Sequence, residues 1–456
     1  MQIPYLIEIT YLVASVLFIY GLKAMSHPTT ARRGMNAAAV GMMAAIVGTL
    51  LHREIVSYQW IIIGLVIGSL IGAAMSIWMP MTAMPQRTAL SHAFGALAAT
   101  IVGIAEFYRY SGELTSFKMT AIGFEVLFGG ITVTGSLIAF AKLQGLIRGT
   151  PVTYKGQNIV NISLFVAAVG IFVYLIFFPV GILFYVLVGM AFLFGVLLVL
   201  PIGAADMPVV MSLMNSYAGL ASAATGFALN NKVLIIAGTL DGFSGLILSI
   251  LMCRAMNRSI TNVLFGAFGA VGTEETQVEG TMREISVDDV AVQMAYARQV
   301  VFVPGYGMAT AQAQHALREL ADTLEKRGVS VKYAIHPVAG RMPGHMNVLL
   351  AEANVPYSLL YELEQVNPEM PTTDVAVVVG ANDTVNPDAR DNPKSAIAGM
   401  PIIEVDRATQ VIVLKRGQGK GFSGIENPLF FKSNTAMLYG DAKDSLAKLT
   451  TAIQQT

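Results

Sequence analysis

The sequence predicts two parts: a polytopic α-helical membrane domain of about nine transmembrane helices, then an α/β, Rossmann-like domain with a doubly wound parallel sheet. Three observations support this prediction. Only 13% of the 456 residues are charged, against about 25% in soluble domains. Long apolar runs separated by short polar gaps fill the chain up to Arg254. After Val300, short apolar strands alternate with helical stretches. We therefore divide the chain into a membrane domain (1–253), a linker (254–285) and a soluble domain (286–456).

The membrane spans follow from length, because a helix needs about 20 apolar residues to cross a bilayer. Nine runs qualify, although the second is short: 5–22, 36–51, 59–79, 89–108, 120–141, 159–178, 181–200, 207–228 and 232–252. One alternating set of short loops holds nine basic residues: Lys23, Arg32, Arg33, Arg87, Lys142, Arg148, Lys155, Arg254 and Arg258. The other set holds four: Arg53, Arg109, Lys118 and Lys232. Basic loops stay in the cytoplasm, so we expect a plasma-membrane protein with its N-terminus outside and its soluble domain in the cytoplasm.

Ionisable groups within spans are candidates for function because they are costly in lipid. His92 is the only histidine inside a predicted span. It is either a proton carrier, since histidine titrates near neutral pH, or a packed side chain. Asn215 could hold a water, pair with His92 or join helices. Asp241 could line a polar cavity. Glu125 is expected to reach the membrane interface, and Asp206 to begin a helix at the cytoplasmic mouth of the eighth span.

The soluble part shows the alternation typical of a parallel sheet with helices on both faces. We expect strands at 299–303, 330–335, 374–379, 402–405 and 410–414. Helices are expected at 287–297, 309–327, 343–353 and 442–454.

A glycine turn, Gly305-x-Gly307, follows the first strand and opens a helix. This is the context in which glycines let a phosphate approach a helix N-terminus. The third fingerprint position is Thr310 rather than Gly or Ala, and no acid ends the next strand to bind the ribose of NAD. Instead Lys415 and Arg416 end what we take as the last strand. They suit a 2′-phosphate, or else form a solvated basic turn.

Two further loops follow strands, at the edge where open α/β sheets bind ligands. They are 336–346, with His336, Arg341 and His345, and 380–386, with Asp383. Two histidines without a third ligand do not predict a metal site.

Several strings resemble one family, the proton-translocating nicotinamide nucleotide transhydrogenases. The soluble strings are Gly305–Ala309, His336–Leu349 (HPVAGRMPGHMNVL), Gly380–Pro387 (GANDTVNP) and Glu426–Leu429 (ENPL). The membrane strings are Ala205–Tyr217 (ADMPVVMSLMNSY) and Cys253–Ser259 (CRAMNRS). They are similar to the beta subunit, and the similarity covers essentially the whole chain.

The resemblance implies hydride transfer between NAD(H) and NADP(H), driven by protons that cross the membrane. NADP(H) would bind this chain, and NAD(H) an alpha subunit that also brings transmembrane helices, as a dimer of alpha–beta units. His92, Asn215 and Asp206 would serve the proton pathway and its coupling. The implied cofactor-binding residues are Gly305, Tyr306, Gly307, Met308, Ala309, Arg341, Gly344, Asp383, Lys415, Arg416, Gly421 and Phe422.

Two departures from the family matter. Phe422 stands where relatives often have tyrosine, and Asp241 replaces an expected apolar residue. The alternative function is a transporter or channel with a nucleotide-sensing cytoplasmic domain. A channel should show a filter-like loop or rings of charge, which the sequence lacks. The 29 basic and 29 acidic residues give no basic footprint for nucleic acid.

Overall fold

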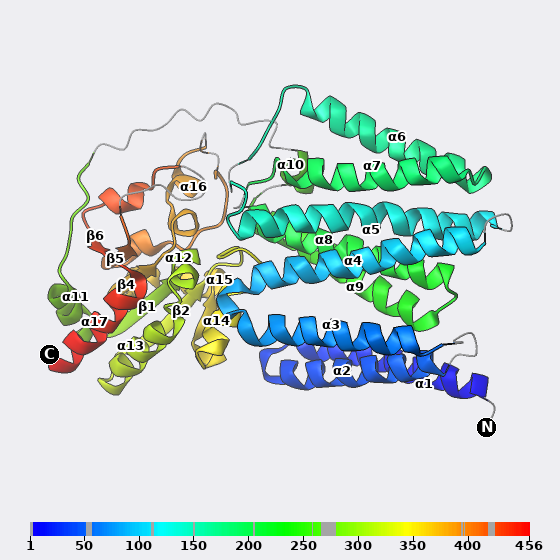
Figure 1. Ribbon diagram of the computed structural model, residues 1–456. Coiled ribbons are helices and arrows are strands. Elements are labelled where there is room, and N and C mark those ends of the chain that lie inside the picture. The colour runs from blue at the N-terminus through cyan, green and yellow to red at the C-terminus, as the bar shows by residue number, and fades with distance from the viewer. Residues whose placement is uncertain are drawn as a thin grey trace.

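The computed structural model describes residues 3–51, 57–110, 114–148, 151–203, 206–257, 259–265, 280–393, 395, 397–417 and 425–456. Figure 1 shows a bundle of long helices with an α/β domain at one end of it. The N-terminus lies at the far end of the bundle, and the C-terminus lies on the outer side of the α/β domain.

Nine long helices form within the described part of the membrane region, one at each predicted span. They are α1 (Ile3–Met25), α2 (Pro28–Leu50), α3 (Gln59–Trp78), α4 (Met84–Arg109), α5 (Ser116–Leu143), α6 (Gln157–Phe177), α7 (Gly181–Val199), α8 (Met207–Ala228) and α9 (Lys232–Ala255). Seven of them are long and apolar enough to cross a membrane; α2 and α8 are not among the seven. Arginines and small residues dilute the apolar character of α2. In α8, which is largely buried, packing replaces lipid contact.

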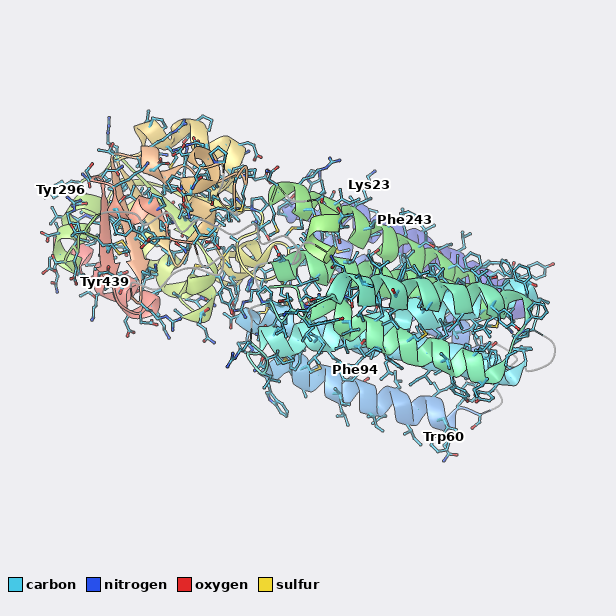
Figure 2. All side chains as sticks on the ribbon, turned by 90° about the horizontal axis from the view of Figure 1, so that it is seen from above. Lys23, Trp60, Phe94, Phe243, Tyr296 and Tyr439 are labelled. Atoms are coloured by element: carbon cyan, nitrogen blue, oxygen red, sulfur yellow. The ribbon has the colours of Figure 1, made fainter. Side chains whose placement is uncertain are left out.

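The bundle is organised around α5, which packs against α4, α6, α7 and α8. Most residues of α5 are buried. In contrast, α3 buries none of its twenty residues. Its glycines Gly64, Gly68 and Gly72 have open space where a Cβ would lie. In Figure 2, Trp60 of α3 points away from the rest of the bundle, and 74% of its surface is exposed.

Close backbone contact joins α8 to α9. A Cβ on Gly219 would lie 2.3 Å from the backbone nitrogen of Gly242, and one on Gly245 would lie 2.7 Å from that of Ser216. Ser216 Oγ also donates to the carbonyl of Gly242 at 2.7 Å. Small residues permit such contacts between membrane helices, and here they set the register of α9 against α8.

The soluble domain is a six-stranded parallel sheet in the order β3-β2-β1-β4-β5-β6. The strands are β1 (Gln299–Pro304), β2 (Ser330–Ile335), β3 (Leu360–Glu362), β4 (Val375–Val379), β5 (Gln410–Lys415) and β6 (Thr435–Tyr439). Side chains alternate across the sheet: Val300 and Phe302 join one core, and Val301 and Val303 join the other. The first core is covered by α11 (Val287–Ala295), α13 (Gln314–Lys326), α14 (His345–Glu352) and α17 (Ala442–Gln455). The predicted fold class is confirmed.

The strand predicted at 402–405 is wrong. Ile403 is buried, but its backbone N–H donates to Thr384 rather than to a strand, and a short 3₁₀ helix, Val405–Arg407, follows. Asn367 supplies the other bonds, donating to the carbonyl of Ile402 and accepting from the N–H of Glu404. An apolar run indicates burial, and here a side-chain amide satisfies the backbone in place of a neighbouring strand.

Two strands were not predicted, the short β3 and the buried edge strand β6. As a result Lys415 ends the fifth strand, not the last one. The predicted helix 309–327 is also two helices, α12 (Tyr306–Thr310) and α13, separated where Gln312 takes a left-handed φ of 51°. In the predicted linker, α10 (Ile260–Phe265) is helical, and Glu284 pairs with Met437 in a parallel bridge. The domain boundaries themselves stay predictions.

The contact between α8 and α9 yields a matched test. We expect Gly245→Val to destabilise the isolated chain by about 1–3 kcal/mol, because the new side chain would overlap the backbone of α8. Gly68→Val should leave stability unchanged, since nothing lies near Gly68 in this chain. Thermal unfolding of the detergent-solubilised chain measures both. Equal melting temperatures for the two variants would contradict the packing described here.

Candidate functional site

A pocket of about 470 Å³ lies at the carboxyl ends of the strands. Strand order turns at β1 and β4, since β2 follows on one side and β5 on the other. Ligands of doubly wound sheets bind at such a switch point. The pocket is lined by the loops after β1, β2, β4, β5 and β6, by Asp206 of the membrane region and by Met256, which directly follows α9.

Two glycine loops interlock at the floor of this pocket. The N–H of Gly305 donates to the carbonyl of Val379 at 2.9 Å, and that of Gly307 to the carbonyl of Gly380 at 2.8 Å. A Cβ on Gly305 would lie 2.5 Å from the carbonyl oxygen of Gly380. A Cβ on Gly307 would lie 2.6 Å from the Cα of Gly380. Gly380 itself has a φ of 65°. The contact therefore requires glycine at all three positions, and it leaves an open cradle without side chains.

The predicted residues of the turn divide into two groups. Gly305, Tyr306 and Gly307 line the pocket. Met308 and Ala309 are buried in the core beneath it. The hydroxyl of Thr310, at the third fingerprint position, donates back to the carbonyl of Tyr306 one turn earlier in the short helix.

The loop after β2 is held by two buried, neutral histidines. His336 Nδ1 accepts from the N–H of Val338 at 3.2 Å, so its Nε2 carries the proton and donates to Pro401 at 2.6 Å. His345 Nδ1 accepts from the N–H of Arg341 at 3.1 Å. Burial lowers the pKa of His336 to about 4, and burial with the nearby Arg341 charge does the same for His345. Among the described residues no cluster of potential metal ligands forms.

Arg341 lies between the two parts of the chain. Its guanidinium stacks over the ring of Tyr306, 4.1 Å from the centroid, and its Nη1 donates to the carbonyl of Leu143 at 3.1 Å. The neighbouring Gly340 has a φ of 107°, and a Cβ there would lie 2.5 Å from His345 Nδ1. Gly344, with a φ of 66°, begins α14. The loop conformation thus depends on both glycines.

The loops after β4 and β5 bring acid and base together. Asp383 and Lys415 both line the pocket. Burial lowers the pKa of Lys415, and the charge of Asp383 partly offsets that effect. Lys415 Nζ lies 4.4 Å from the centre of the Phe430 ring. Arg416 lines the same pocket and is exposed. Gly421 and Phe422, which were predicted to bind the cofactor, lie outside the described residues.

Residues that we did not single out from the sequence support these loops. Asn427 is buried, and its Nδ2 donates to the carbonyl of Asn382 at 3.0 Å. Asn386 is fully buried and donates to the carbonyl of Glu426. Both lie in the strings that carried the family resemblance, which was the signal available for them.

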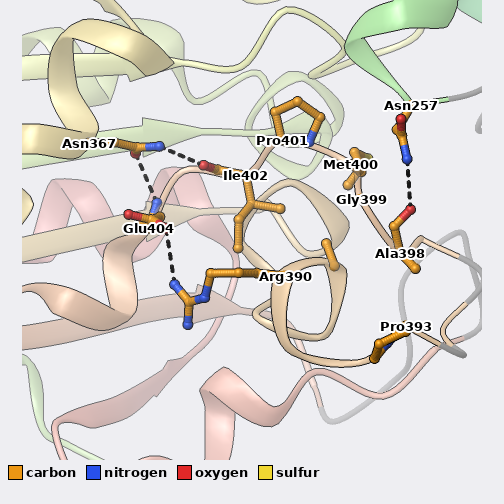
Figure 3. Close-up of a pocket in the computed structure, with 11 residues that line it drawn as sticks. Asn257, Asn367, Arg390, Pro393, Ala398, Gly399, Met400, Pro401, Ile402 and Glu404 are labelled. Atoms are coloured by element: carbon orange, nitrogen blue, oxygen red, sulfur yellow. Dashed lines mark hydrogen bonds and ion pairs between the residues drawn. The ribbon is translucent and has the colours of Figure 1, made fainter.

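A second pocket, of about 600 Å³, lies against the segment 389–404 (Figure 3). Its one arginine, Arg390, is fully engaged: the guanidinium pairs with Asp391, Glu404 and Asp406. At the rim, Asn257 Nδ2 donates to the carbonyl of Ala398 at 3.1 Å. Because its cation is already paired with carboxylates, this pocket is a poor anion site, and the strand-end pocket is the better candidate.

The strand-end pocket opens toward the membrane region. Asp206 begins α8 and lines the pocket beside the glycine loops. Val338 packs into a cluster with Val209, Met252 and Cys253. Gln312 Nε2 approaches Thr82 Oγ1 at 3.5 Å. The carboxyl edge of the sheet therefore faces the ends of the helices.

A second polar group lies within the bundle. Asn215 on α8 lies beside His92 on α4, and its Nδ2 donates to Asp241 Oδ1 on α9 at 3.0 Å. The structure thus brings together three of the predicted polar residues. Glu125 is separate and fully buried, accepting from Thr225 Oγ1 at 2.6 Å. The expectation that Glu125 reaches the interface is wrong, because Thr225 on α8 gives its carboxyl a partner inside the bundle.

Comparison with known proteins gives a consistent result. The family model "NAD(P) transhydrogenase beta subunit" matches residues 7–452. A protein of Rhodospirillum rubrum named NAD(P) transhydrogenase subunit beta is 47% identical over 454 residues, covering 97% of this chain and 98% of that protein. A protein with the same name, from a defined strain of the same species, matches with the same values.

The two buried histidines predict a pH dependence. The pKa of histidine in an unfolded chain is 6.5, whereas burial lowers the pKa of His336 and of His345 to about 4 in the folded domain. The unfolded chain then binds more protons between these values. The free energy of unfolding should fall as pH drops from 6.5 to 4, by up to about 3 kcal/mol per histidine.

Hydrogen–deuterium exchange of residues 330–353, corrected for the intrinsic rate, measures this loss of protection. His27→Gln is the matched control, because His27 is exposed at the start of α2, outside this segment, and should not alter the effect. Protection that is constant over this pH range would show that the imidazoles are not held neutral.

Proposed function

The chain belongs to the NAD(P) transhydrogenase beta subunit family, and we propose how its two parts divide the work of that enzyme. Transhydrogenases transfer hydride between NAD(H) and NADP(H), and this chain is one subunit of such an enzyme. The soluble domain binds NADP(H) in the strand-end pocket. The helices conduct protons, and the junction between the two parts couples proton movement to the state of the nucleotide. The alternative, a transporter or channel, is not favoured.

The residues present fit NADP(H). The glycine cradle at Gly305, Gly307 and Gly380 has no side chains to obstruct a diphosphate. Lys415 and Arg416 line the same pocket, and a planar guanidinium with an ammonium suits a 2′-phosphate. After β2 the chain continues into His336, which is buried and bonded to Pro401, where an NAD site would present an acid to the ribose.

The observation that carries the proposal is the position of Asp206. A residue of the membrane region lines the nucleotide pocket beside Asp383 and Lys415. A change of charge or conformation at the end of α8 therefore acts directly on the loops that would hold NADP(H). Asn215, on the same helix about two turns further in, lies beside His92 and donates a hydrogen bond to Asp241. One helix thus connects the proton-binding side chains to the pocket.

Hydride transfer needs a second nucleotide. Donor and acceptor nicotinamides must lie face to face, and the described part of this chain forms one sheet with one strand-end pocket. The nicotinamides themselves carry the redox chemistry, while the protein positions them and excludes water. NAD(H) then binds the alpha subunit, in a dimer of alpha–beta units. The soluble domain lies in the cytoplasm and the N-terminus outside the bacterial plasma membrane.

The predicted proton pathway and its coupling involve His92, Asn215 and Asp206, and the contact with Asn215 adds Asp241 as a further member. Histidine is the side chain suited to take and release a proton near neutral pH, and Asn215 lies beside the imidazole while its amide donates to the carboxyl of Asp241. A membrane potential supplies about 2.3 kcal/mol per charge per 100 mV. Coupling requires that the protonated and neutral states of this group favour different arrangements at the end of α8.

The nucleotide preference should reside in two cations. We expect Lys415→Ala combined with Arg416→Ala to weaken NADP(H) binding by at least about tenfold, because charge-assisted bonds to a phosphate are lost. NAD(H) binding should change little. Lys326→Ala combined with Lys448→Ala removes the same charge from exposed positions on α13 and α17 and serves as the control. Calorimetric titration of the parent chain and both double variants with NADP(H) and with NAD(H) measures these affinities. Equal losses for NADP(H) and NAD(H) would remove Lys415 and Arg416 from the site.

The pathway is tested in vesicles that contain the chain and its alpha subunit. His92→Ala should abolish proton pumping and the response of turnover to the proton gradient, while NADP(H) binding persists. Asp241→Asn keeps a partner for Asn215 but removes the titratable carboxyl, so a loss of pumping in this variant would assign proton binding to Asp241 as well. Normal pumping by His92→Ala would make His92 a packing residue.

A further inference from the structure

The C-terminal end of α5 holds a buried lysine, Lys142. Lys142 has only 2% of its surface exposed. Its Nζ donates to the carbonyls of Val199 at 3.4 Å, Leu200 at 2.5 Å and Ile202 at 2.7 Å. An ammonium has three donors, and all three are used here. These carbonyls belong to the end of α7 and the turn after it, where a helix has unpaired acceptors and a negative pole. Through these hydrogen bonds Lys142 connects the C-terminal end of α5 to the C-terminal end of α7.

The next residue presents an acceptor to the soluble domain. The carbonyl of Leu143 receives no backbone N–H from the described residues. Instead it accepts from Gln86 Nε2 on α4 at 3.3 Å and from Arg341 Nη1 at 3.1 Å. The negative pole of a 28-residue helix thus faces a guanidinium from the other half of the chain, a favourable arrangement.

On the other side, Arg341 does not itself line the strand-end pocket but contacts a residue that does. Its guanidinium stacks on Tyr306, which lines that pocket, and its backbone N–H is fixed by His345. Arg341 therefore lies between the pocket wall and the end of α5. Its guanidinium can therefore bond either to a ligand in the pocket or to the carbonyl at the end of α5.

We propose that Arg341 is a positioning residue that alternates between the carbonyl of Leu143, which holds the soluble domain against the helices, and the phosphates of the nucleotide. This rests on the proposed NADP(H) site. A bond from a guanidinium to a phosphate is about twice as strong as one to a neutral acceptor. Nucleotide binding therefore breaks the bond from Arg341 to the carbonyl of Leu143 and weakens the contact between the soluble domain and the helices. By linkage, the docked state binds NADP(H) more weakly by the same factor.

A pair of cysteines reports docking without touching Arg341. Thr82→Cys and Gln312→Cys replace two side chains that meet across the junction, in a Cys253→Ala background that removes the chain's single cysteine. The rate of cross-linking by a short dimaleimide is measured in the assembled enzyme with NADPH, with NADH and without nucleotide. NADPH binding to the same samples is measured in parallel.

We expect saturating NADPH, but not NADH, to slow cross-linking by about 5-fold or more, within the usual range of coupling between sites. Arg341→Gln should cross-link slowly without nucleotide and lose the response to NADPH. Arg318→Gln, on the outer helix α13, is the control and should behave as the parent does. Adding Lys142→Met to Arg341→Gln should slow cross-linking no further, because Lys142 only holds the end of α5 in place and so affects docking through the bond that Arg341→Gln already removes.

The outcomes separate the two proposals. If NADPH binds but cross-linking is unchanged or faster, or if Arg341→Gln cross-links like the parent, the alternation of Arg341 is refuted. If NADPH does not bind, the proposed nucleotide site fails. Slow cross-linking by nucleotide-free Arg341→Gln would then support its contact with Leu143 alone.

Discussion

A polar group at the depth of a bilayer must find its partner inside the protein, since lipid offers none. This constraint accounts for the polar contacts in the membrane half. Glu125 is paired with Thr225, Asn215 with Asp241, and Lys142 with the carbonyls that end α7. Each pair joins two helices, so each also fixes how those helices lie. The groups able to carry charge are therefore also the groups that hold the bundle together, and a change in the protonation of one alters the packing of two helices.

Close backbone approach plays the corresponding role in both halves. Gly219 and Gly242 let α8 and α9 touch, which brings Asn215 within reach of Asp241. Gly307 and Gly380 let two strand-end loops touch, which shapes the pocket. In each case the side chain that glycine lacks would separate two pieces of backbone. The glycines thus set the distances between the polar residues that we propose carry the function.

Much of this could be predicted from the sequence, and the errors have physical causes. Strands β1, β2, β4 and β5 were predicted correctly because buried parallel strands are continuous apolar runs. The same signal misplaced a strand at 402–405, where Asn367 satisfies the backbone. It missed β6 (Thr435–Tyr439), whose central residues Ala436, Met437 and Leu438 are not β-branched like the valines of β4. Gly305, Asp383, Lys415 and Arg416 do line one pocket, because carboxyl ends of parallel strands meet at one edge. The burial of Glu125 could not be foreseen, since it depends on Thr225, a hundred residues away.

The uncovered helix α3 contributes little to the cohesion of its own chain. None of its residues is buried, and its row of glycines faces open space. The free energy of folding of the isolated chain is therefore almost indifferent to where α3 lies, and its position is decided by whatever else shares the membrane. A helix of this kind acquires its structure by assembly rather than by folding. Substitutions along it would be silent in any assay of the lone subunit, and their effects would appear only in the completed enzyme.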